Sequence, residues 1–172
     1  MALQAAAQLG DRVSRLVLLE AAPYDLLRQA GRHEAYGAAR ALHQLVREGS
    51  AKGEWRAIAQ QFLSAFAGPG AWQAMSEERR TRAADLMLQN RFEWDALMSA
   101  TMPLEEWRRR TPERTLLVSA ADTWPPLREL MEVFRAGCPN WAFALLPEGG
   151  HMAPLSRPEL VNPIIRDFLI EP

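Results

Sequence analysis

Three short, unbroken apolar runs constrain the fold of this chain more than any other feature. They are Leu-Val-Leu-Leu at residues 16–19, Thr-Leu-Leu-Val at 115–118 and Ala-Phe-Ala-Leu-Leu at 142–146. Strands that are buried on both faces of a parallel sheet have such continuous apolar sequences. Helical patterns separate the runs, and strands that alternate with helices form parallel sheets with right-handed crossovers. We therefore predict an α/β fold with about three parallel strands and flanking helices.

Helix signals surround these strands. Residues 2–9 are rich in alanine and end before Gly10, which predicts a short helix. A second helix is predicted for residues 125–137, after the second strand. After the third strand, Ser156 and Glu159 have the spacing of a capping box, which predicts a terminal helix to Leu169.

About ninety residues between the first two strands have helical spacing and no strand signal. The pattern predicts helices near residues 33–48 and 53–67, and a third that Ser76 caps and that runs to about residue 99. We expect this segment to be an insertion at one end of the sheet.

Composition restricts the classes of partner. The chain has 172 residues, 48% of them hydrophobic, and a net charge of −1, so no overall field favours nucleic acid or an anionic membrane. A single cysteine, Cys138, excludes an internal disulfide and fits a reducing compartment. No apolar run approaches a membrane span, and the first residues lack the basic start of a signal peptide. These features predict a cytoplasmic protein with no nucleic-acid or membrane partner.

The sequence Leu-Pro-Glu-Gly-Gly-His after the third strand contains the strongest candidate for chemistry, His151. Ligands of open α/β sheets bind beyond the carboxyl ends of the strands, and two glycines allow a sharp backbone path there. The alternative is an ordinary loop histidine.

Two carboxylates are candidate partners of this histidine. Asp122 follows the second strand and could accept the imidazole N–H; its alternative role is to cap the next helix. Glu20 directly follows the first strand, where burying a carboxylate is costly unless it is paired. Glu20 is thus a second candidate partner, or a group that lines a pocket or anchors a loop.

Other motifs are lacking. There is no Gly-x-Gly-x-x-Gly, no P-loop and no Cys/His/Asp spacing for a metal, so we predict neither cofactor nor metal. His33 and His43 are far apart in helical segments and are interpreted as surface or core residues.

The order of these parts resembles the second half of an α/β-hydrolase fold enzyme. The resemblance rests on the Arg12-Val13-x-x-Leu16-Val17-Leu18 strand, the strand that ends near Asp122, and the terminal Gly150-His151 followed by Pro158-Glu159 and Phe168-Leu169. It covers essentially the whole chain. It implies a core of residues 1–23 and 111–172, and a helical cap, or lid, of residues 24–110.

The family's triad runs in the order nucleophile, acid, histidine, with the serine in a Gly-x-Ser-x-Gly elbow before a helix. No serine of this chain lies in that motif. The resemblance places the elbow just upstream of Met1, with a serine as nucleophile, or an aspartate as in dehalogenase and epoxide-hydrolase relatives, so we expect a truncated hydrolase whose isolated chain is inactive. His151 is then the general base, and Asp122 the expected acid. Glu20 is the alternative acid, because it matches a position used by haloalkane dehalogenases.

The resemblance implies a small or medium apolar ester-like substrate. The competing hypothesis is a non-catalytic binding module or pseudoenzyme that uses the cap and the exposed sheet edge, through which copies of the chain could also associate.

Overall fold

The structure is a computed structural model that describes residues 2–170. The helices are α1 (Ala2–Leu9), α2 (Asp25–Gln29), α3 (His33–Lys52), α4 (Trp55–Ala67), α5 (Glu77–Ser99), α6 (Leu104–Arg110), α7 (Pro125–Gly137), α8 (Ala153–Ser156) and α9 (Pro158–Ile170). The strands are β1 (Leu16–Leu19), β2 (Thr115–Ala120) and β3 (Ala142–Leu146), and two 3₁₀ turns are η1 (Gly10–Arg12) and η2 (Gly150–Met152).

The three strands form one parallel sheet in the order β1-β2-β3. Leu16 pairs with Thr115, and Leu116 pairs with Ala142. The central strand β2 is buried along its whole length, as its continuous apolar sequence predicts. The predicted α/β class with three parallel strands and flanking helices is confirmed.

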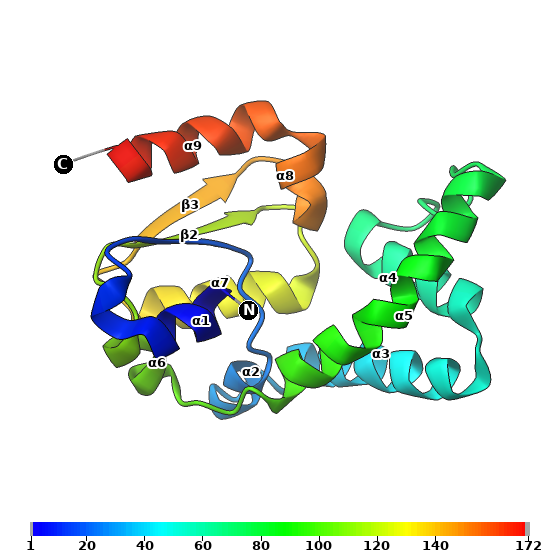
Figure 1. Ribbon diagram of the computed structural model, residues 1–172, viewed down its shortest axis with the longest axis horizontal. Coiled ribbons are helices and arrows are strands. Elements are labelled where there is room, and N and C mark those ends of the chain that lie inside the picture. Colours follow the sequence, from blue (N-terminus) through cyan, green and yellow to red (C-terminus); the bar gives the residue numbers. More distant parts are fainter. Residues whose placement is uncertain (1, 171–172) are drawn as a thin grey trace.

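Alternate residues of the strands pack on opposite faces of the sheet. Leu18 and Leu117 belong to the large core that faces α7, whereas Leu116 and Val118 pack with Val161 of α9 on the other face. Figure 1 shows this layering, with α9 on one side of the sheet and α1, α6 and α7 on the other. The sheet is therefore the middle layer of a helix–sheet–helix arrangement.

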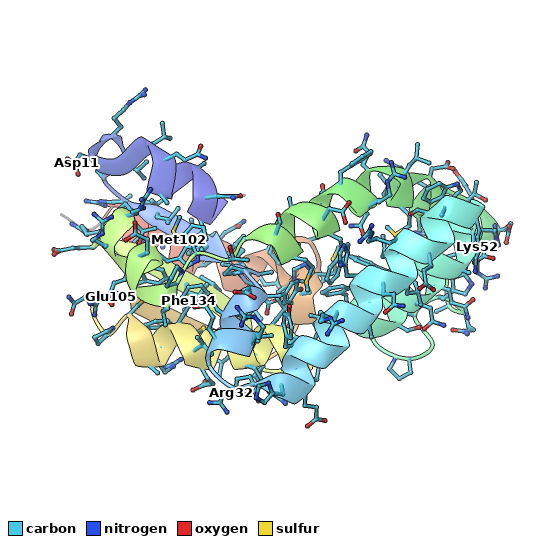
Figure 2. The ribbon with its side chains drawn as sticks, turned by 90° about the horizontal axis from the view of Figure 1, so that it is seen from below. Asp11, Arg32, Lys52, Met102, Glu105 and Phe134 are labelled. Carbon is cyan, nitrogen blue, oxygen red and sulfur yellow. The ribbon has the colours of Figure 1, made fainter. Side chains whose placement is uncertain are left out.

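Helices α3, α4 and α5 form an arm that projects beyond the end of the sheet (Figure 1). In Figure 2, α3 runs from Arg32, which lies near α7, to Lys52 at the far end of the arm. The other helices of the expected cap, α2 and α6, contact α7. The division at residues 24–110 stays a prediction.

Two predicted helix starts have different outcomes. Ser76 caps α5 by accepting a hydrogen bond from the amide of Arg79, as predicted. The capping box at Ser156 is wrong, because Ser156 ends α8 and its hydroxyl donates to the carbonyl of Met152 at 3.1 Å. Helix α9 begins at Pro158, which has no N–H to be capped.

No helix within residues 2–170 combines the length and apolar character needed to cross a membrane.

Candidate functional site

Glu20 lies at the carboxyl end of β1 and turns its side chain toward β2. Its backbone has φ +48°, the one non-glycine residue with positive φ in the described chain, although its amide still bonds to Val118 of β2. This conformation is uncommon outside glycine and costs about 1–3 kcal/mol, which the surroundings must offset. The side chain is 7% exposed.

Four hydrogen bonds hold the Glu20 carboxylate. Oε1 accepts from the Ser119 hydroxyl at 2.9 Å and from the Ala120 amide at 3.1 Å. Oε2 lies 2.8 Å from the Thr123 hydroxyl and 2.8 Å from Nδ1 of His151. A carboxylate has about four lone-pair positions, and these contacts occupy them, so the group has one fixed orientation.

Glu20 is held in its ionised form. Burial acts to raise its pKa, but the hydrogen bonds from His151, Ala120 and Thr123 and the charge of His151 outweigh burial, and the pKa lies below the ordinary value. An ionised carboxylate can only accept hydrogen bonds, so Nδ1 of His151 is the donor.

His151 lies in η2, directly after two glycines with positive φ, and its side chain is 34% exposed. Because Nδ1 carries the proton, the neutral ring has its lone pair on Nε2. Within the described residues, Nε2 has no hydrogen-bond partner. The ring is therefore oriented on one side and available to accept a proton on the other.

Asp122, the expected acid, does not bond to His151. Its Oδ1 accepts from the Gly150 amide at 2.8 Å and its Oδ2 from the Gly149 amide at 3.1 Å. It is not a helix cap either, because Trp124 precedes α7 and no side chain caps it. Asp122 misses the imidazole because β2 continues two residues beyond the predicted run, to Ala120, and Asp122 therefore lies in the turn beside the glycines.

The two glycine amides also affect the pKa of Asp122. Burial acts to raise its pKa, but hydrogen bonds from the backbone N–H groups of Gly150, Gly149 and Asp122 itself lower it overall.

Aromatic side chains connect His151 to the arm. The ring of Phe66, at the end of α4, lies 4.8 Å from the His151 ring and 4.9 Å from that of Trp124. Trp124 in turn contacts Tyr24 edge-on, and Tyr24 stacks on Trp94 of α5 at 5.3 Å. Trp94 is buried in the core and Trp124 is partly buried against it, so the contact of Phe66 with His151 places the end of α4 beside the candidate site.

A cavity of about 350 Å³ adjoins the Glu20–His151 pair. Its other walls are mainly apolar and come from the start of α1, the open side of β1 and the end of α5; they include Leu3, Leu19 and Leu97. No serine, threonine or cysteine of the described residues lines it.

The hydroxyl and thiol groups elsewhere have other contacts. Ser119 is buried and donates to Glu20, and Ser64 donates to a carbonyl within α4. Cys138 is buried at the end of α7, where burial raises its pKa to about 11, so it is not a thiolate.

Sequence reasoning did not single out Ser119, Thr123 or Phe66. Ser119 and Thr123 carry a usable signal, because they are hydroxyl residues at the end of an apolar strand that adjoins the strand ending in Glu20. Phe66 carries none, since it lies in an ordinary helical pattern and meets His151 only in three dimensions.

Metal chemistry has no evident site in the part of the chain described. No group of three or more His, Cys, Asp or Glu side chains there could hold a metal ion. His43 lies on α3 and pairs with Asp95 of α5 at 2.6 Å, which joins two helices of the arm.

In comparisons with known proteins, no protein-family model matches the chain and no solved structure matches it significantly.

Proposed function

We propose that this chain contributes the acid–base pair of an α/β-hydrolase triad, with His151 as the base and Glu20 as its orienting acid. The observation that carries the proposal is the geometry of that pair. A buried, four-fold hydrogen-bonded carboxylate lies 2.8 Å from Nδ1, and Nε2 is free of partners within the described residues. A histidine held in this way is suited to general acid–base catalysis.

In the proposed reaction, Nε2 takes the proton from a nucleophile as it attacks an acyl carbon. Glu20 remains ionised and stabilises the imidazolium that forms. The imidazolium then returns the proton to the departing alcohol, and the free imidazole activates a water that releases the acid. The proposed substrate is the small or medium apolar ester that the resemblance implies, and the apolar side chains near the pair, such as Phe66 and Leu97, suit such a substrate.

The nucleophile in this proposal comes from a segment outside the 172 residues. Among described residues no hydroxyl or thiol lines the cavity or bonds to Nε2. The edge of β1 that faces away from β2 has no strand partner there. In a parallel pair alternate residues bond to the neighbour, so the backbone groups of Val17 and Leu19 point toward this open edge. A further parallel strand along β1 would end beside His151.

The test begins with the coding sequence upstream of the Met1 codon. We expect an in-frame apolar strand followed by Gly-x-Ser-x-Gly. A stop codon with no such motif would favour the alternative, a non-catalytic binding module that uses the open edge of β1.

The second step assays p-nitrophenyl butyrate hydrolysis by the 172-residue chain and by the chain with its upstream segment. We expect turnover from the extended protein alone, reduced at least about 10³-fold by His151→Ala. His43→Ala is the matched control, since His43 also pairs with a carboxylate but lies in the arm. Turnover by the 172-residue chain that His151→Ala abolishes would contradict the proposal.

A further inference from the structure

The end of β2 and the turn that follows it hold both members of the Glu20–His151 pair. Ser119 and Ala120 of β2 and Thr123 of the turn donate hydrogen bonds to the Glu20 carboxylate. Asp122, in the same turn, bonds to the two residues that precede His151. The five residues from 119 to 123 are thus the common support of the acid and of the loop that presents the base.

Asp122 makes two parallel contacts with consecutive amides. Each carboxylate oxygen accepts one N–H, at 2.8 Å from Gly150 and 3.1 Å from Gly149. Successive backbone N–H groups in such turns form a concave anion site, and hydrogen bonds to a charged acceptor are about twice as strong as neutral ones. Gly149 and Gly150 have φ values of +113° and +55°.

The carboxyl ends of β2 and β3 meet at this point. The amide of Ala121 donates to the carbonyl of Leu146, the last residue of β3, at 2.9 Å. Among the described residues, 147–150 make no other hydrogen bond to the turn at residues 121–123 than those to Asp122. The Asp122 carboxylate therefore joins this loop to the end of β2, while Glu148 and Gly149 contact Arg157 and Ser156 on the other side.

We propose that Asp122 is a positioning residue that fixes the Gly149–Gly150 loop so that Nδ1 of His151 meets Glu20. The role rests on the proposed function only in what His151 does chemically. Asp122 touches neither the imidazole nor the cavity that adjoins the pair, and it acts through the two glycine amides.

The test uses the ¹⁵N-labelled 172-residue chain and reads the site without turnover. A proton held between Nδ1 and a buried carboxylate exchanges slowly with water and gives a resolved downfield resonance. In Asp122→Ala we expect this resonance to be lost and hydrogen exchange at Gly149 and Gly150 to accelerate at least about tenfold. A merely structural residue would lower stability and leave the imidazole resonance in place.

Asp122→Asn is the second variant, because it keeps the size of the side chain and one acceptor oxygen. We expect it to lose protection at one glycine amide and to weaken the Nδ1–H resonance. Glu148→Gln is the matched control: Glu148 lies in the same loop, but pairs with Arg157 at 2.9 Å. We expect it to behave as wild type.

The proposal is overturned if folded Asp122→Asn or Asp122→Ala protein keeps the wild-type imidazole resonance, or if Glu148→Gln loses it equally. If Asp122→Ala does not fold, Asp122→Asn decides. Neither signal requires a nucleophile, so an inactive extended protein would contradict the proposed function and leave this result intact.

Discussion

At the scale of single residues, the candidate site depends on Glu20 more than on any other side chain. The residue adopts a strained backbone conformation at the end of β1 and in return gains four hydrogen bonds for a buried carboxylate. Strain of this kind is retained where neighbouring contacts over-determine it, and it is concentrated at functional sites.

Glu20 predicts an acid-dependent loss of stability. Its pKa is lower in the folded protein than the ordinary 4.5, so it stabilises the fold above that pH, and the stabilisation is lost as pH falls through the folded value. Glu20→Gln cannot titrate. We expect it to cost about 1–3 kcal/mol at pH 7 and to flatten the decline below pH 4.5.

Urea unfolding between pH 7 and pH 3 measures both effects. Equal slopes of unfolding free energy against pH in wild type and Glu20→Gln would contradict an ionised, hydrogen-bonded Glu20.

The carboxylate that pairs with His151 was only partly predictable from the sequence. The sequence contained both carboxylates and the histidine, and placed all three at the carboxyl edge of the sheet. Which carboxylate meets the ring depends on the positive φ of Glu20 and on two further strand residues, Ser119 and Ala120. Neither depends on local apolar pattern, so the sequence favoured Asp122.

At the scale of elements, continuous apolar runs were sufficient to find every described strand, because burial on both faces leaves a strong signal. Helices α3 and α4 were evident from their apolar spacing, and α5 from the cap at Ser76. One helix boundary was predicted wrongly. Ser156 and Glu159 have the spacing of a capping box, but Ser156 ends α8 and the next helix begins at Pro158.

The glycines of the η2 loop make the clearest test at this scale. Gly149 has φ +113°, and a Cβ there would lie 2.8 Å from Cβ and 3.1 Å from Cα of Ala153. Gly150 has φ +55°, and the nearest atom that a Cβ there would meet, apart from its chain neighbours, is the carbonyl oxygen of Phe66 at 3.6 Å. We expect Gly149→Ala to lose more than about 2 kcal/mol, from backbone strain and overpacking, and Gly150→Ala to lose about 1 kcal/mol.

Thermal and urea unfolding of the two variants gives the comparison. Equal losses would mean that the contact with Ala153 does not restrict this loop.

At the scale of the whole molecule, the sheet has two edges, and the edge at β1 adjoins the apolar cavity. Leu19 is 41% exposed there, and an unpaired apolar edge tends to pair with another chain. We expect the 172-residue chain to associate with itself at high concentration.

Leu19→Lys should suppress that association, because a charge on an edge strand opposes pairing. The control is Leu145→Lys, which places the same charge on β3, at an exposed site on the other edge strand. Light scattering after size exclusion measures the mass of each variant. Association that Leu145→Lys reduces as much as Leu19→Lys would contradict the role of the β1 edge.

The protonation pattern of the His151 ring tests most directly the claim that Glu20 orients this base. Long-range ¹H–¹⁵N spectra at neutral pH identify which ring nitrogen carries the proton. We expect neutral His151 to be protonated at Nδ1 in wild type, with Nε2 free, and to lose that preference in Glu20→Ala. A wild-type ring protonated at Nε2, or one that Glu20→Ala leaves unchanged, would contradict the acid–base pair.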